Sequence, residues 1–172
     1  METKPKKEQS SSILGIFKRW LPSIIMLPVM IWLVMNRGTY TWIDNADLVI
    51  HEAGHVFFSI FGRFIYTLGG TLMQIILPSL IAWYFWKNNY STGAQVGFLW
   101  LGQNLINISV YAADARAKSL PLLGGNKVYH DWEYILGTLN ILQYDLVVGY
   151  LLFILAVIVF ISTLLLPLFF HE

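Results

Sequence analysis

The sequence lacks cysteine altogether and has few charged residues. None of its 172 residues is a cysteine, which excludes disulfides, thiolate metal sites and cysteine nucleophiles. Only 12% of the residues are charged, whereas 56% are hydrophobic, a composition typical of a polytopic membrane protein rather than a water-soluble domain. The formal net charge of +1 offers no excess of positive charge for nucleic acid. We therefore expect membrane lipids around the chain and no nucleic-acid partner.

Apolar segments separated by short polar turns predict an all-α, polytopic integral membrane helix bundle. We expect five transmembrane helices, over residues 21–35, 48–63, 64–86, 94–115 and 146–169. Residues 13–20 and 132–144 are amphipathic and are expected to lie as helices at the membrane interface. Residues 1–12 are rich in lysine and serine and are predicted to be a disordered tail. Residues 13–172 would then form a single transmembrane domain.

The distribution of basic residues predicts the orientation of the chain. If five helices cross and the N-terminus is cytoplasmic, Arg37 and Lys87 are the two basic residues outside, and the other nine of the 11 lie inside. Such a bias matches the rule that cytoplasmic loops carry the excess of lysine and arginine. The prediction is a multi-pass protein of a bacterial-type plasma membrane, with its N-terminus in the cytoplasm and its C-terminus outside.

The segment His51-Glu52-Ala53-Gly54-His55 is the candidate functional motif of the sequence, because it has the pattern H-E-x-x-H. Residues four apart lie on one face of a helix, so His51 and His55 could both bind one metal ion. Glu52 would lie close enough to that ion to take a proton from a metal-bound water. Two imidazoles and a carboxylate are costly inside an apolar helix unless something pairs with them. This pattern predicts a Zn²⁺ site rather than a chance pentapeptide.

An H-E-x-x-H motif within a membrane helix resembles the site-2 protease family of intramembrane zinc metalloproteases. The resemblance implies that His51 and His55 bind zinc, that Glu52 is the general base, and that an aspartate from a later helix completes the site. The family's later motif is N-P-x-x-x-D-G or L-D-G, and this chain has neither. Its nearest equivalent contains Asp114, in the segment from Tyr111 to Arg116.

Two further residues are candidate metal ligands. Asp114 ends a predicted membrane helix, and an acid near the membrane needs a cation, which favours a metal role. His130 could be a third or fourth ligand, or a solvent-facing residue at the entry of the following helix. Asp131 fits the cap of that helix better than a ligand position. If Asp114 and His130 both bind, no position stays open for water, which would indicate a structural ion.

A row of polar residues accompanies this predicted site. Asn104, Asn107, Tyr111 and Asp114 are spaced three, four and three apart, so they share one helical face toward the bundle. For the two asparagines, hydrogen bonding between helices is the favoured role. Asp47 precedes His51 by one turn and could hydrogen-bond the ring nitrogen that does not bind the metal, which would hold His51 in its ligating tautomer. Favourable interaction with the helix dipole is the better-supported role for Asp47.

These features leave two classes of function open. The first is a membrane-embedded zinc hydrolase whose substrate is a peptide bond in the membrane segment of a partner, or else the amide or ester of a lipid. The second is a metal-stabilised membrane scaffold or regulator that lacks catalysis. A glutamate between the two histidines favours the enzyme, because a structural metal site needs no general base.

Overall fold

The computed structural model describes residues 13–120 and 129–170. The predicted tail over residues 1–12 and the segment 121–128 lie outside the described residues. The described chain contains no β-strand, which confirms the all-α prediction. Its α-helices are α1 (Ile13–Met35), α2 (Trp42–Phe57), α3 (Arg63–Lys87), α4 (Ser91–Ala113), α5 (Asp131–Thr138) and α6 (Asp145–Leu165). Short 3₁₀ helices lie at η1 (Ser59–Phe61), η3 (Leu142–Tyr144) and η4 (Leu166–Phe169).

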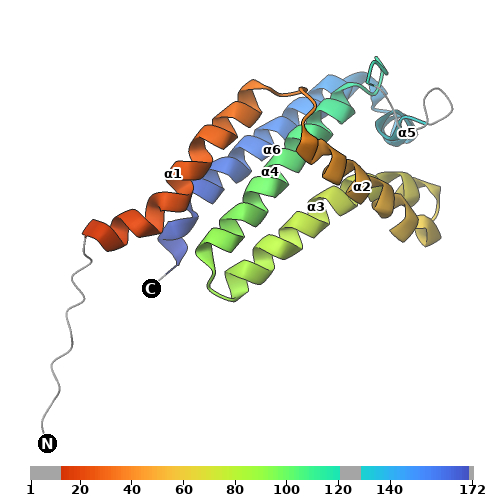
Figure 1. Cartoon of the computed structure of the whole chain (residues 1–172). Coiled ribbons are helices and arrows are strands. Elements are labelled where there is room, and N and C mark those ends of the chain that lie inside the picture. The colour runs from red at the N-terminus through yellow and green to blue at the C-terminus, as the bar shows by residue number, and fades with distance from the viewer. Residues whose placement is uncertain (1–12, 121–128, 171–172) are drawn as a thin grey trace, which may run out of the picture.

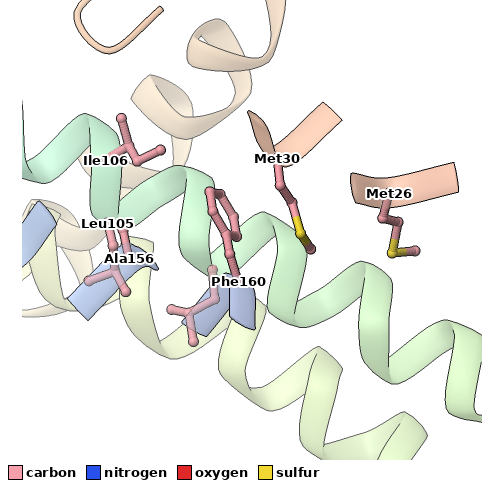
Figure 2. Packing of buried hydrophobic residues seen from close by; sticks show 7 residues of the cluster. Met26, Met30, Leu105, Ile106, Ala156 and Phe160 are labelled. Carbon is pink, nitrogen blue, oxygen red and sulfur yellow. The ribbon is translucent and has the colours of Figure 1, made fainter. Parts of the chain in front are cut away.

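Helix α4 is the centre of the bundle. It packs most extensively on α6 and α3, and α1 packs on both α4 and α6. The side chains between α1, α4 and α6 form an apolar core (Figure 2), and its buried members are Met26, Met30, Leu101, Leu105, Ile106, Ala156 and Phe160. Helix α2 lies obliquely against the end of α3 that is nearer to α5 (Figure 1). The H-E-x-x-H helix is thus positioned mainly by its packing on α3.

Three helical segments are long and apolar enough to cross a membrane: Leu14–Met35, Arg63–Lys87 and Leu142–Phe169. These match three of the five expected crossings. Helix α2 has 16 residues and is about 24 Å long at 1.5 Å per residue, which is short of a hydrocarbon core of about 30 Å. Helix α4 has sufficient length, but its amide side chains lower its hydropathy. The membrane assignment therefore rests on three helices, and a count of five stays a prediction.

Glycines allow α2 and α3 to come into backbone contact. A Cβ added to Gly69 of α3 would lie 2.7 Å from the carbonyl oxygen of Gly54 in α2. A Cβ added to Gly54 would lie 2.7 Å from the carbonyl carbon of Gly69. Neither position can take a larger residue without separating the two helices, because both contacts are with backbone. Gly54 belongs to the H-E-x-x-H motif, so this crossing fixes the motif against α3.

Candidate metal centre

Three side chains converge on one point between α2 and α5. The Nε2 atom of His51 lies 2.9 Å from Oδ2 of Asp131, and Nε2 of His55 lies 3.2 Å from the same oxygen. Among the described residues, these three form the one group of histidine and acidic side chains close enough to hold a metal ion together. Both histidines are buried and Asp131 is largely so. The i, i+4 spacing therefore places the two imidazoles as the sequence predicts.

A hydrogen bond at Nδ1 of His55 fixes the tautomer of the ring, so that Nε2 faces Asp131 as an acceptor. Nδ1 of His55 lies 2.8 Å from the backbone carbonyl oxygen of Tyr66. A carbonyl oxygen can only accept, so Nδ1 must carry the hydrogen. In the neutral ring, Nε2 then presents a lone pair to the shared point. Metal-binding histidines are commonly oriented by a hydrogen bond of this kind.

A chain of buried side chains fixes the His51 ring in the same way. Trp100 can only donate, and its indole N–H lies 2.9 Å from Oδ1 of Asp47. Asn104 donates to that oxygen at 3.1 Å and accepts from the Gln74 amide at 3.2 Å. Oε1 of Gln74 then faces Nδ1 of His51 at 2.9 Å. Because every donor in this chain is determined by its neighbour, Nδ1 of His51 must donate and Nε2 is left as an acceptor.

Helix α3 also leaves space for the His51 ring. A Cβ added to Gly70 would lie 2.5 Å from both Nε2 and Cε1 of His51. The absence of a side chain at Gly70 lets the imidazole lie against α3 while Nε2 points toward Asp131. The glycine pair of α3 thus has two uses, since Gly69 meets the backbone of α2 and Gly70 accommodates the ring.

The three converging atoms need a positive charge between them. With both imidazoles neutral, the atoms at the shared point are two nitrogen lone pairs and a carboxylate oxygen, which repel one another at about 3 Å. Burial would raise the pKa of Asp131, but when a ring carries a proton at Nε2, hydrogen bonds and charge from His51 and His55 outweigh burial and hold that pKa below its usual range. Asp131 is therefore ionised at neutral pH. A metal ion would satisfy all three atoms, and the donor set fits one.

The structure corrects the roles that were assigned around α5. His130, and not Asp131, is the N-cap of this helix, since its Nδ1 accepts from the backbone N–H of Glu133 at 3.3 Å. Burial lowers the pKa of His130 despite the neighbouring carboxylates, which agrees with a neutral, accepting ring. Asp131 is in the first helical turn, where its carboxylate points to the two histidines. Capping preference considers only local sequence, which is why it could not separate the two adjacent residues.

Asp114 and His130 do not join the three-residue group. The Asp114 carboxylate accepts from the Ser119 hydroxyl and from the backbone N–H groups of Ser119 and Leu120. Burial would raise the pKa of Asp114, but these hydrogen bonds outweigh it and hold that pKa below its usual range. Nε2 of His130 lies 3.5 Å from Oδ2 of Asp114. In this structure Asp114 closes the turn after α4, and His130 lies beside it.

The rest of the polar row of α4 connects α4 to its neighbours. Asn107 donates to Oδ1 of Asp44 at 2.8 Å, and Asn104 donates to Asp47 as described above. Both are hydrogen bonds between helices, the role favoured for them from sequence. The Tyr111 hydroxyl accepts from the backbone N–H of Asp131 at 3.1 Å. Asp47 acts on His51 only through Asn104 and Gln74.

The group lies in the wall of a cavity of about 900 Å³. His51, Glu52, His55 and Asp131 all line this cavity. The Glu52 side chain is exposed, and it makes no hydrogen bond or ion pair within the described residues. A carboxylate that is not itself in the metal-binding group is therefore available beside it, within the same solvent-accessible space.

Comparison of the chain with models of known protein families, with curated proteins and with solved structures found no match. Any statement about what the site does must therefore come from its geometry.

Proposed function

We propose that this protein is a membrane-embedded, zinc-dependent hydrolase that cleaves a peptide bond in the membrane segment of a partner. The observation that carries the proposal is the arrangement of two histidine Nε2 atoms and one aspartate oxygen around one point, beside a glutamate outside that set. Catalytic zinc sites typically have three protein ligands and an open fourth position, whereas structural sites have four protein ligands.

The distances from each histidine nitrogen to the Asp131 oxygen suit zinc. Bonds of about 2.0–2.1 Å arranged tetrahedrally put neighbouring ligand atoms about 3.3 Å apart. The distances of 2.9 and 3.2 Å between the histidine nitrogens and the Asp131 oxygen are close to this value. Nitrogen and carboxylate ligands are common for zinc, and the chain has no thiolate to offer. The hydrogen bonds to both Nδ1 atoms supply the orienting contacts that such ligands need.

Each residue of the site then has a defined task. When bound, the ion would polarise a carbonyl group and lower the pKa of water to about 7. His51, His55 and Asp131 would hold the ion, and Gln74 and the Tyr66 carbonyl keep the two rings in the binding orientation. Glu52 accepts a proton at a carboxylate oxygen as water adds to the substrate carbonyl carbon, and returns it to the departing nitrogen.

The lining of the cavity favours a peptide over a lipid chain. The lining includes five polar side chains, namely those of Asn36, Thr39, Thr41, Gln103 and Asn107. Another part is apolar and includes Trp32, Leu33, Leu48, Ile106 and Val110. A peptide bond is open to attack only where a membrane helix unwinds, and the freed backbone groups then need partners. Acyl chains need none, so the polar side chains in the lining support the peptide substrate.

Replacement of Glu52 by glutamine tests the proposal. Glu52→Gln keeps the size of the side chain and removes the base, so turnover should fall by about 10²–10⁴-fold while bound zinc is unchanged. The substrate would be sought by comparing membrane-protein fragments and lipid species in cells that carry wild type, Glu52→Gln or His55→Ala. Glu133→Gln is the matched control, because Glu133 pairs with the exposed Lys118 and should be neutral.

Three outcomes separate the alternatives. Fragments of membrane proteins that depend on both Glu52 and His55 support the protease. Lipid species that change with both residues, in the absence of such fragments, would identify a lipid amidase or esterase instead. If wild type and Glu52→Gln match each other while His55→Ala differs, the metal is structural and the chain is a scaffold.

A further inference from the structure

Arg63 lies in the wall of the same cavity and has no acidic partner. Its guanidinium carbon lies 4.7 Å from the centre of the Tyr134 ring and 5.3 Å from that of Tyr129. Within residues 13–120 and 129–170, the guanidinium makes no ion pair and no hydrogen bond. Among the described residues that line the cavity, Arg63 is the only arginine or lysine. It is the one permanent positive charge facing a space that also holds Asp44, Glu52 and Asp131.

Arg63 is near residues that contact the metal centre on both α3 and α5. On α3, Arg63 comes one turn before Tyr66, whose carbonyl oxygen holds the His55 ring. On α5, its partner Tyr134 comes one turn after Asp131. One helical turn is about 5 Å along the axis. Arg63 is therefore one helical turn along the chain from Tyr66, and it contacts a residue one turn from Asp131, so a substrate bound in the shared cavity could contact both Arg63 and the metal centre.

Aromatic contacts leave the binding edge of a guanidinium available. A ring interacts with the flat face of the cation, whereas the N–H groups of arginine point outward in its plane. These N–H groups form a fork that matches the two oxygens of a carboxylate. An anionic group that entered the cavity would be repelled by Glu52 and Asp131 and attracted to Arg63. The tyrosines restrain the guanidinium without occupying its donors.

We propose that Arg63 binds a carboxylate of the substrate. The carboxylate would lie a few residues along the peptide from the bond that is hydrolysed, because Arg63 and the metal centre line the same cavity and an extended peptide advances about 3.3 Å per residue. The group would be an acidic side chain or a free C-terminus. The proposal rests on the proposed function only in that it takes the bound peptide to be the substrate.

The test measures peptide binding to metal-free protein in neutral detergent, so that it does not depend on catalysis. The probe is an acetylated, otherwise apolar tetrapeptide amide that ends in aspartate, compared with the same peptide ending in asparagine. A charge-assisted hydrogen-bonded pair should make the acidic peptide bind about 10- to 100-fold more tightly. Arg63→Gln should abolish this difference, and Arg63→Lys, which lacks the fork, should restore only part of it. Zinc affinity should be the same in all three proteins.

Three results would overturn the proposal. Equal binding of the two peptides to wild type would mean that Arg63 does not select an acid. Loss of zinc binding in Arg63→Gln with the peptide preference retained would mean that Arg63 merely docks α5. Displacement of the acidic peptide by short-chain phosphatidylglycerol but not phosphatidylcholine would assign Arg63 to an anionic lipid headgroup. Failure of the proposed function gives a different result, because wild type would then bind no zinc yet still prefer the acidic peptide.

Discussion

Substitution of Gly70 by alanine tests how closely α3 fits the His51 ring. The added Cβ would lie 2.5 Å from His51 Nε2, and ordinary contact begins at 3.4 Å. The ring must therefore move by roughly 0.9 Å, the difference between these two distances. Bond lengths in a metal site tolerate only about 0.2 Å. The displaced ring would also lose its hydrogen bond to Gln74, so His51 should cease to be an effective ligand.

Metal affinity, rather than stability, should report this change. Alanine in place of glycine favours a helix by about 1 kcal/mol, and the overpacking costs about 1–3 kcal/mol. The two effects partly cancel, so metal-free Gly70→Ala should unfold within about 2 kcal/mol of wild type. Loss of an orienting contact alone lowers metal affinity about 10–100-fold. Displacement of the ligand itself should lower it by at least about 100-fold.

The assay is competition for zinc with a chromogenic chelator, together with thermal unfolding of the metal-free protein in detergent. Gly137→Ala is the matched control, because a Cβ at Gly137 has no atom within 4 Å. It makes the same chemical change in the helix that carries Asp131 and should leave zinc affinity unchanged. Zinc affinity in Gly70→Ala within twofold of Gly137→Ala would refute the account of how His51 is held.

Three further predictions follow from the same contacts. Asp131→Asn should abolish zinc binding measured by elemental analysis, whereas Asp114→Asn should retain it; the reverse pattern would restore Asp114 as the third ligand. Gln74→Ala should lower zinc affinity about 10–100-fold, because Nδ1 of His51 would lose its acceptor. An unchanged affinity in chelator competition would show that the hydrogen bonds linking Asp47, Asn104 and Gln74 to His51 are only structural. Reporter fusions at Lys87 and Arg116 should report opposite sides of the membrane, outside and inside respectively, and identical readouts would mean that α4 does not cross.

Part of the site could be predicted because it depends on local periodicity. His51 and His55 are four residues apart on one helix, so the geometry of the α-helix alone brings their rings together. Glu52 lies beside them for the same reason. The helical fold also follows from local properties, since long apolar segments in a chain of this composition have few alternatives to helices.

Two signals in α3 were present in the sequence but had no assigned role. Gln74 is the one amide of an otherwise apolar helix, and an isolated polar group in such a helix usually faces a partner. Gly69 and Gly70 interrupt the same apolar segment, and paired small residues allow close approach of a neighbour. Which neighbour, and which ring would fill the space, depends on how α2 crosses α3.

Two contacts of the candidate site depend on the tertiary structure alone: the position of Asp131 beside the histidines, and the acceptor of the His55 Nδ1 hydrogen. Asp131 follows His51 by 80 positions, and local sequence favoured a cap there because aspartate is a preferred N-cap residue. It becomes a candidate ligand only because α5 docks beside the two histidines of α2. The acceptor for His55 is the backbone carbonyl of Tyr66. Every residue has a backbone carbonyl, so the identity of residue 66 could not predict this contact. Only the packing of α2 on α3 brings the carbonyl to the His55 ring.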